Sequence, residues 1–146
     1  MENKTVLFVC VHNSARSQMA KAYLKKFGFG LFLAESAGLE AGTLNPLAVQ
    51  VMIEDGINIS QNKTKTADSL LNEGRTYTYV ITVCDESNAE RCPVFPGMLN
   101  RLHWSFADPS KFTGTLEEQL QQTRIVRDEI KKAVFDFLNT YGQRKF

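Results

Sequence analysis

The sequence predicts a single α/β domain built on a four-stranded parallel sheet flanked by helices. Apolar segments rich in β-branched residues alternate along the chain with segments whose apolar residues recur at helical spacing, the βαβ pattern of such folds. The apolar segments lack the regular alternation of a half-exposed strand, as expected for parallel strands buried on both faces. With 146 residues, 43% of them hydrophobic, and no repeat or linker, we expect one domain over residues 1–146.

The first half of the chain predicts two pairs of a strand followed by a helix. The expected elements are a strand over 5–9, a helix from 17 to 27, a strand over 31–37 and a helix from 46 to near 56. Gly28 ends the first helix, with lysines on its outer side, and Pro46 is favoured at the first position of the second. The strands therefore run in the same direction.

The second half of the chain predicts two further strands and a long final helix. The expected elements are a short helix over 67–72, a strand over 77–83, a mobile loop over 85–97, a strand over 99–106 and a helix over 116–141. Pro93 and Pro96 interrupt the loop, and the polar passage 58–66 reads as connecting surface. The apolar residues of the last helix recur on one stripe, which predicts packing against the sheet.

The end of the first expected strand carries the strongest chemical signal. Cys10 and Arg16 form a C-x5-R frame that leads into a helix, and five residues are enough for a loop to surround a tetrahedral oxyanion with its backbone N–H groups. Arg16 can bind two oxygens, while its charge and the helix N-terminus favour the thiolate of Cys10. Ser17 can donate a hydrogen bond to that thiolate. The alternative is a buried strand-terminal cysteine beside an unrelated arginine. The expected substrate-binding residues are Val11, His12, Asn13, Ser14, Ala15, Arg16 and Ser17.

The other two cysteines, Cys84 and Cys92, suggest redox chemistry. Cys84 follows the strand over 77–83 as Cys10 follows the first, and ligands bind beyond the carboxyl ends of parallel strands, so both thiols should face one crevice. An odd number of cysteines is unlike a structural disulfide framework. Zinc is the competing explanation, with His12 and His103 as further ligands, but no C-x2-C or H-x3-H pair is present. Cys84 can also be read as strand core and Cys92 as a surface cysteine.

Asp108 follows the last expected strand and is the candidate proton donor, because a departing oxygen needs a proton as its bond breaks. The alternative is an ordinary turn aspartate before Pro109.

The charge balance gives no sign of a polyanionic partner. The 17 basic and 16 acidic side chains leave a formal net charge of +1, so we expect binding to neither nucleic acid nor membrane. The first apolar segment is only about five residues long, too short for a signal peptide or a membrane span. We therefore expect a cytoplasmic protein.

Several segments together suggest a family. They are Asn13-Ser14-Ala15-Arg16-Ser17-Gln18-Met19-Ala20, Ser36-Ala37-Gly38, Asn45-Pro46, Val83-Cys84-Asp85, Cys92-Pro93, His103 to Pro109 and Val126 to Ile130. In this order they resemble the low-molecular-weight protein tyrosine phosphatase superfamily, and the first looks closest to its thioredoxin-coupled arsenate reductases. The resemblance covers nearly the whole chain.

The resemblance implies a three-cysteine relay for arsenic detoxification. Cys10 attacks arsenate while Asp108, the general acid in both branches of the superfamily, assists loss of hydroxide. Cys84 then attacks the adduct, which releases arsenite and leaves a Cys10/Cys84 disulfide. Cys92 next attacks Cys84, and the Cys84/Cys92 disulfide passes to thioredoxin. The implied protein has no bound cofactor or metal and uses thioredoxin as external reductant, and we expect a monomer.

The sequence departs from the family pattern at two points, and two alternative functions stay open. Seven residues separate Cys84 from Cys92, one more than in the best-known members, and Lys21 stands where some relatives have an acid that binds potassium, although Asn13 and Ser36 match. The first alternative is a low-molecular-weight tyrosine phosphatase that hydrolyses aryl phosphates through a phosphocysteine. The second is a phosphate-binding module without catalysis.

Overall fold

A four-stranded parallel sheet forms the centre of the computed structural model, which describes residues 4–84, 88, 90–96, 98 and 100–142. The strands are β1 (Lys4–Cys10), β2 (Phe32–Gly38), β3 (Tyr79–Thr82) and β4 (Asn100–His103), in the spatial order β2-β1-β3-β4. The helices are α1 (Arg16–Phe27), α2 (Pro46–Glu54), α3 (Ala67–Asn72) and α5 (Leu116–Tyr141), with a 3-10 turn η1 at Pro109–Lys111. The predicted fold class is confirmed.

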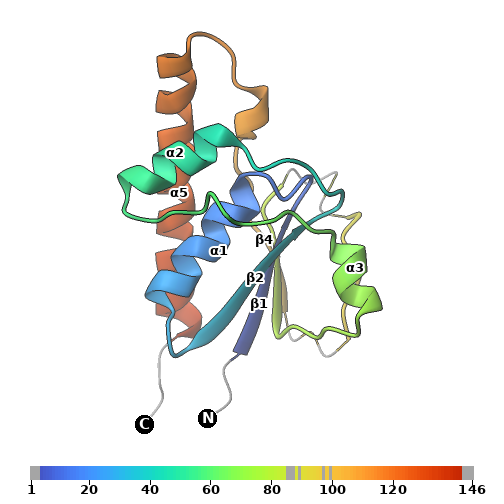
Figure 1. The fold of residues 1–146 in the computed structure, drawn as a ribbon. Helices are drawn as coiled ribbons and strands as arrows, with labels where there is room; N and C mark the ends of the chain where they lie inside the picture. Colours follow the sequence, from blue (N-terminus) through green and yellow to red (C-terminus); the bar gives the residue numbers. More distant parts are fainter. Residues whose placement is uncertain (1–3, 85–87, 89, 97, 99, 143–146) are drawn as a thin grey trace.

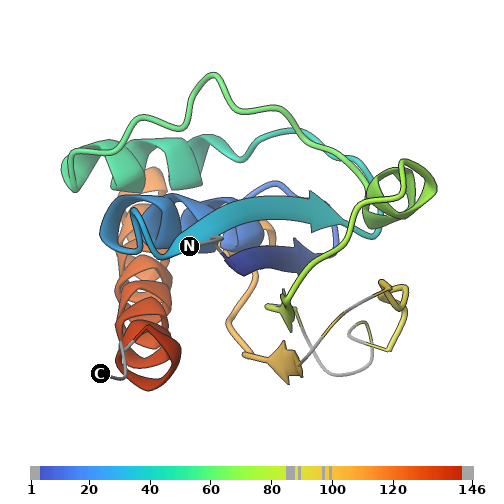
Figure 2. The same cartoon turned by 90° about the horizontal axis from the view of Figure 1, so that it is seen from below.

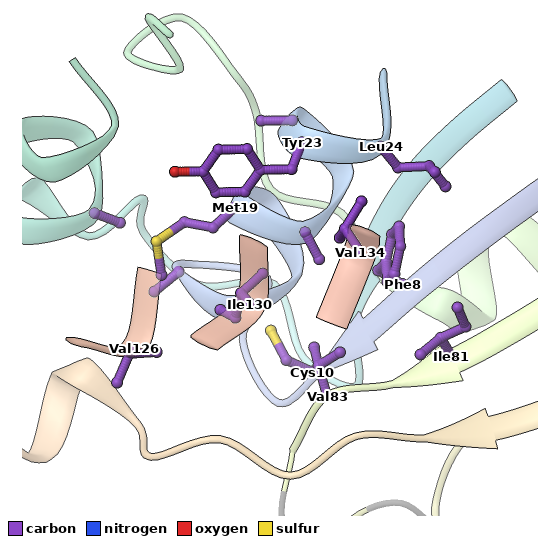
Figure 3. Close-up of a cluster of buried hydrophobic side chains, with 14 of the residues drawn as sticks. Phe8, Cys10, Met19, Tyr23, Leu24, Ile81, Val83, Val126, Ile130 and Val134 are labelled. Atoms are coloured by element: carbon purple, nitrogen blue, oxygen red, sulfur yellow. The ribbon is translucent and has the colours of Figure 1, made fainter. Parts of the chain in front are cut away.

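The two faces of the sheet are covered unequally (Figures 1 and 2). Side chains of β1 alternate between them: Val6, Phe8 and Cys10 join a large apolar cluster with α1, α2 and α5, whereas Leu7 and Val9 join a smaller one. Figure 3 shows Cys10 at the end of β1 among the buried side chains of the large cluster. The smaller cluster takes its cover from α3 and from Cys92 and Phe95. Both faces are thus buried, as the unalternated apolar strands predict.

The predicted element boundaries are wrong mainly at the two late strands. β3 begins at Tyr79 and β4 ends at His103, so both are shorter than predicted. β4 is the edge strand and pairs on one side only, and after the Trp104 N–H, which donates to the Thr82 carbonyl oxygen, the chain leaves the sheet toward Asp108. Of the predicted loop over 85–97, residues 85–87, 89 and 97 lie outside the described residues, as does Leu99.

Gly38 ends β2 where the chain following β1 passes closest. In the sheet register it lies opposite Cys10. A β-carbon on Gly38 would lie 2.7 Å from the backbone nitrogen of Asn13 and 2.5 Å from the carbonyl oxygen of Glu40, closer than real side chains come. The glycine therefore lets the chain after β1 pack directly against the end of β2.

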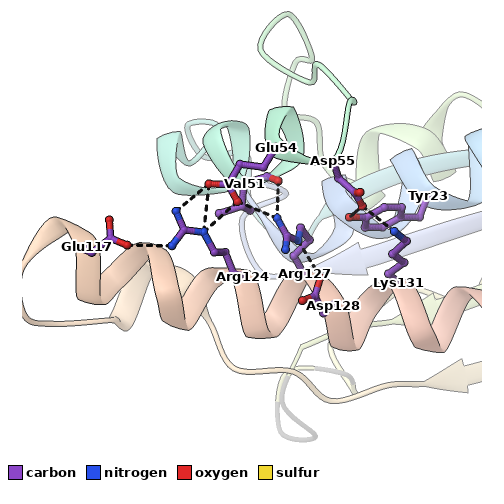
Figure 4. A network of polar contacts seen from close by, with 9 residues as sticks. All are labelled: Tyr23, Val51, Glu54, Asp55, Glu117, Arg124, Arg127, Asp128 and Lys131. Carbon is purple, nitrogen blue, oxygen red and sulfur yellow. Dashed lines mark hydrogen bonds and ion pairs between the residues drawn. The ribbon is translucent and has the colours of Figure 1, made fainter.

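A polar network joins α1 and α2 to the long helix α5 (Figure 4). Arg124 and Arg127 of α5 both contact Glu54 at the end of α2, at 2.8 and 3.0 Å. Asp55 accepts hydrogen bonds from the Tyr23 hydroxyl at 2.7 Å and from Lys131 at 2.9 Å. These contacts join α5 to the C-terminal end of α2 and, through Asp55, to the middle of α1.

No helix in the described part of the chain is long and apolar enough to cross a membrane. The longest, α5, buries its apolar stripe in the large cluster, packed mainly against α1 and α2.

Candidate active site

The loop between Cys10 and Arg16 is held by its carbonyl groups. The carbonyl oxygens of Cys10, Val11, His12 and Ser14 accept hydrogen bonds from the backbone of Leu39, Glu40, Gly42 and Asn45, at 2.8–3.0 Å. Within the described part of the chain, the N–H groups of residues 12–15 have no hydrogen-bond acceptor. We call residues 10–16 the Cys10–Arg16 loop. The backbone N–H groups of residues 12–15, beside the N-terminus of α1, are therefore available to donate hydrogen bonds to a ligand.

Cys10 lies next to a buried hydroxyl. The oxygen of Ser17 is 2.9 Å from Cys10 Sγ, and Asn13 Nδ2 donates to the same oxygen at 2.8 Å. All three residues are buried. Ser17 is the second residue of α1, and the contact with Cys10 that the sequence suggested is present.

Arg16 and Asp108 meet at the mouth of this loop. Arg16 is 5% exposed. It donates to the carbonyl oxygen of Phe106 at 3.2 Å and lies 3.4 Å from the Asp108 carboxylate. Burial raises the pKa of Asp108, but hydrogen bonds from the Ser110 amide and hydroxyl, with the charges of Arg16 and Lys111, outweigh it and hold the pKa below its ordinary value.

A cavity of about 320 Å³ opens over these groups. It is lined by Val11, His12, Arg16, Asn88, Phe106, Ala107, Asp108 and Lys111. Asn88, Phe106, Ala107 and Lys111 were not predicted as site residues, although the last three lie within three positions of Asp108 in the sequence. A larger cavity of about 480 Å³ lies along the outer side of α1, and none of the residues that line it belongs to the candidate site.

The structure separates the three cysteines into two apolar clusters, and none of them is in a disulfide. Cys84 is fully buried in the cluster that contains Cys10. Cys92 is 4% exposed and belongs to the smaller cluster, with Leu70 and Phe95. The alternative of a surface location for Cys92 is therefore wrong. Burial raises the pKa of the Cys92 thiol to about 11, against the opposing charge of Arg101.

The two histidines do not combine with the cysteines. His12 lies at the surface 3.3 Å from Glu40, which also contacts Arg91, the residue before Cys92, at 3.7 Å. His103 Nδ1 is 2.7 Å from the Thr82 hydroxyl on the neighbouring strand. Among the described residues no group of three or more His, Cys, Asp or Glu side chains could hold a metal ion.

The potassium-site residues of some relatives are replaced in part by lysine. Asn13 and Ser36 are both buried, as such a site would need. Lys21 is half-buried, and its pKa is lowered by burial and by the positive charges of Lys65 and Lys25. The charge of Lys21 thus lies near those of Lys65 and Lys25.

Comparison with known proteins places these features in a family. The family model for low molecular weight phosphotyrosine protein phosphatase matches residues 5–145. The chain belongs to this family. Within the family, it is similar to the arsenate reductase of Bacillus subtilis strain 168, with 41% identity over 141 residues that cover 96% of this chain and 99% of the relative.

Two solved structures of family members are also similar to this one. One, described as an arsenate reductase in the phosphate binding state, has a TM-score of 0.75 and 30% identity, and the match covers 94% of this chain and 98% of that one. The thioredoxin-dependent arsenate reductase of Corynebacterium glutamicum has a TM-score of 0.60 and 28% identity, with 92% of this chain and 63% of that one covered.

Proposed function

We propose that this chain reduces arsenate to arsenite through a relay of three thiols and that thioredoxin restores it. The observation that carries the proposal is the placement of Cys84. Hydrolysis of a phosphate ester requires one nucleophilic cysteine, yet a second thiol is buried in the same cluster as Cys10. Relatives named arsenate reductase at 41% identity support the same conclusion.

The substrate is a tetrahedral oxyanion bound by the Cys10–Arg16 loop. The loop offers three features that bind anions: N–H groups of residues 12–15 that have no acceptor among the described residues, the N-terminus of α1, and the Arg16 guanidinium. The cavity of about 320 Å³ accommodates an inorganic anion with room for solvent. A tetrahedral anion bound there receives hydrogen bonds on several oxygens and neutralising charge from Arg16.

Substitution at arsenic comes first. The Cys10 thiolate attacks As(V) and a hydroxide departs, taking a proton from Asp108 to leave as water. The lowered pKa of Asp108 keeps its carboxylate ionised at neutral pH, so it acts as an acid only once its pKa rises. A bound dianion supplies that rise, since its negative charge repels the carboxylate and competes for Arg16.

Arsenic is reduced when Cys84 attacks the adduct, and a second exchange then moves the disulfide to Cys92. The Cys84 thiolate attacks Cys10 sulfur, the S–As bond breaks, and its electron pair stays on arsenic, which leaves as arsenite. Cys92 then attacks Cys84 sulfur and expels the Cys10 thiolate, and the thioredoxin dithiol reduces the Cys84/Cys92 disulfide. In sum, arsenate and the thioredoxin dithiol give arsenite, water and the thioredoxin disulfide.

Cys92 must leave its buried position before it can attack Cys84 and before thioredoxin can reach the resulting disulfide. At 4% exposure and with its pKa raised to about 11, the thiol is neither accessible nor ionised at neutral pH. We propose that the Cys10/Cys84 disulfide displaces the segment around Cys92, which exposes the thiol when it is needed. The relay thereby protects Cys92 from oxidation between turnovers.

The remaining parts of the proposal concern the setting of the reaction. No resident cofactor is needed because the electrons come from thioredoxin, and cytosolic thioredoxin is consistent with a cytoplasmic monomer whose thiols stay reduced at rest. We also propose that the chain binds neither nucleic acid nor membrane.

Arsenate-dependent oxidation of NADPH, coupled through thioredoxin and thioredoxin reductase, tests the proposal. The wild-type chain should sustain turnover, and Cys84→Ser should abolish it while leaving slow hydrolysis of an aryl phosphate, because only the redox route needs a second sulfur. If wild type hydrolyses aryl phosphates rapidly and oxidises no NADPH, it is a phosphatase. If it does neither but binds phosphate, the non-catalytic module is the correct description.

A further inference from the structure

A chain of hydrogen bonds leads from Cys10 into the interior. Ser17 Oγ lies 2.9 Å from Cys10 Sγ, and Asn13 Nδ2 donates to Ser17 Oγ at 2.8 Å. Gln18 Nε2 in turn donates to Asn13 Oδ1 at 3.2 Å. Ser17, Asn13 and Gln18 are each at most 1% exposed, so these groups find their partners in the protein rather than in bulk water.

Main-chain groups fix the direction of these bonds. Gln18 Nε2 also faces the carbonyl oxygens of Asn13 and Lys63, at 3.0 and 3.2 Å, and a carbonyl only accepts. The backbone N–H of Lys65 donates to Asn13 Oδ1 at 3.1 Å, and an N–H only donates. The oxygen of the Asn13 carboxamide therefore faces Lys65 and Gln18, and its nitrogen faces Ser17.

This direction decides what Ser17 does at the sulfur. The Ser17 hydroxyl has one proton, and because its oxygen accepts from Asn13, that proton is available to Cys10 Sγ. A hydrogen bond donated to sulfur favours the thiolate over the thiol. A reversed Asn13 carboxamide would instead take the Ser17 proton and leave the sulfur without this donor.

Gln18 also holds the backbone of Asn13. Among the described residues Asn13 is the only non-glycine with a positive φ, at 56°. This left-handed conformation is unfavourable for most residues, so it persists where neighbouring groups hold it. The Gln18 bond to the Asn13 carbonyl does so, and Asn62 Nδ2 donates to Gln18 Oε1 at 3.1 Å from the outer side.

We propose that Gln18 is a positioning residue for Cys10: its carboxamide holds Asn13 with its amide nitrogen toward Ser17 and thereby makes Ser17 a donor to the Cys10 sulfur. The inference rests on the proposed function only in taking Cys10 as the nucleophile. Gln18 neither hydrogen-bonds the sulfur nor lines the cavity over the loop, so it acts through Asn13 and Ser17.

The test is the pH dependence of Cys10 alkylation by iodoacetamide, followed in the full chain by mass spectrometry of the Cys10 peptide. Gln18→Met keeps the length of the side chain and removes both polar atoms. The alkylation midpoint should rise by about half a pH unit, an approximately threefold loss of thiolate below the midpoint, because the Lys65 amide still holds part of the arrangement. Protection of Cys10 by inorganic phosphate should change less than about twofold, since Arg16 and the loop N–H groups are intact.

Two variants separate positioning from general destabilisation. Tyr23→Phe removes a 2.7 Å hydrogen bond from the same helix, far along α1 from the loop, and should leave the midpoint unchanged. Ser17→Ala should raise the midpoint, and adding Gln18→Met to it should raise it no further, because Gln18 acts through Ser17.

An unchanged midpoint in Gln18→Met, or a full additional rise in the double variant, would overturn the proposal. If Gln18→Met does not fold, Asn62→Leu replaces it, with a smaller rise expected and no rise overturning the proposal. The assay contains no arsenate, so a shifted midpoint in a chain that fails to reduce arsenate counts against the proposed function and leaves the role of Gln18 standing.

Discussion

Arg16 is placed to exchange partners. Its guanidinium contacts the Phe106 carbonyl and the Asp108 carboxylate, both at the mouth of the cavity where an anion would bind. A bound oxyanion offers two oxygens to the same planar fork, which a lysine ammonium cannot match.

We predict that Arg16→Lys weakens the binding of phosphate and sulfate by about tenfold or more, the loss expected for a charge-assisted hydrogen bond. Isothermal titration with phosphate measures it. Arg75→Lys is the matched control, because Arg75 pairs with Glu35 at the surface and lines no part of the cavity. Equal phosphate affinities for wild type and Arg16→Lys would contradict the proposal that Arg16 binds the oxyanion.

Cys92 gives a second prediction at the same scale. Its pKa of about 11 and its 4% exposure predict slow alkylation in the folded, reduced chain at pH 8, far slower than in urea. The thiolate fraction should rise with pH toward that value. Peptide mapping with isotopically distinct reagents before and after unfolding measures the difference, and rapid labelling of Cys92 in the folded chain would show that it is not buried.

Among the elements, α1 contributes both to the candidate site and to the packing of α5. Its first turn supplies Arg16, Ser17 and Gln18 to the site, and its middle supplies Tyr23 to the contact with α5. The Tyr23 hydroxyl is the largest cause of the lowered pKa of Asp55, followed by Lys131. Tyr23 itself has a raised pKa, chiefly through burial.

Tyr23→Phe should therefore destabilise the fold by about 1 kcal/mol at neutral pH, a typical value for one buried hydrogen bond. Because the folded-state pKa of Asp55 is lowered, its contribution is present above the ordinary value of 3.8 and is lost as pH falls through the folded value. Urea unfolding of wild type and variant from pH 7 to pH 2 should show the difference shrinking in acid. If the difference in unfolding free energy between wild type and Tyr23→Phe does not change with pH, the hydrogen bond between Tyr23 and Asp55 does not contribute as predicted.

Sequence periodicity predicted the helices better than the strands. Pro46, Gly28 and the Thr115 cap mark helix ends by local chemistry, and α3 and α5 have the predicted bounds. The length of β4 depends instead on pairing with β3 across the sheet, which no local pattern encodes. The Trp104 N–H still donates to the Thr82 carbonyl oxygen at 2.8 Å, but residues 105–108 belong to no strand. Their partly apolar sequence nevertheless resembles a strand.

The candidate site shows the same division. Spacing within eight consecutive residues predicts the group of Cys10, Arg16 and Ser17. The structure brings Arg16 of this group to Asp108. The role of Gln18 could not be predicted, because its partners at Lys63 and Asn62 lie more than forty positions away in the chain. The burial of Cys92 likewise depends on Leu70 and Phe95, which only the folded sheet brings to it.

Over the whole molecule, the sheet separates the three cysteines of the proposed relay between its two faces. Cys10, which Figure 3 shows among the buried side chains, and Cys84 belong to the large cluster, while Cys92 belongs to the small cluster on the other face of the sheet. The first disulfide can thus form within one cluster, and the second requires the segment around Cys92 to move. On this account oxidation drives the exposure of the thiol that thioredoxin reduces.

Disulfide mapping after one equivalent of arsenate, without thioredoxin, tests this account most directly. Wild type should accumulate Cys84/Cys92, and Cys92→Ser should release one equivalent of arsenite and stop at Cys10/Cys84, because no thiol remains to carry the oxidation onward. Cys92→Ser should also fail to turn over with thioredoxin. A wild-type chain that forms no Cys84/Cys92 disulfide, or a Cys92→Ser variant that turns over at the wild-type rate, would contradict the relay.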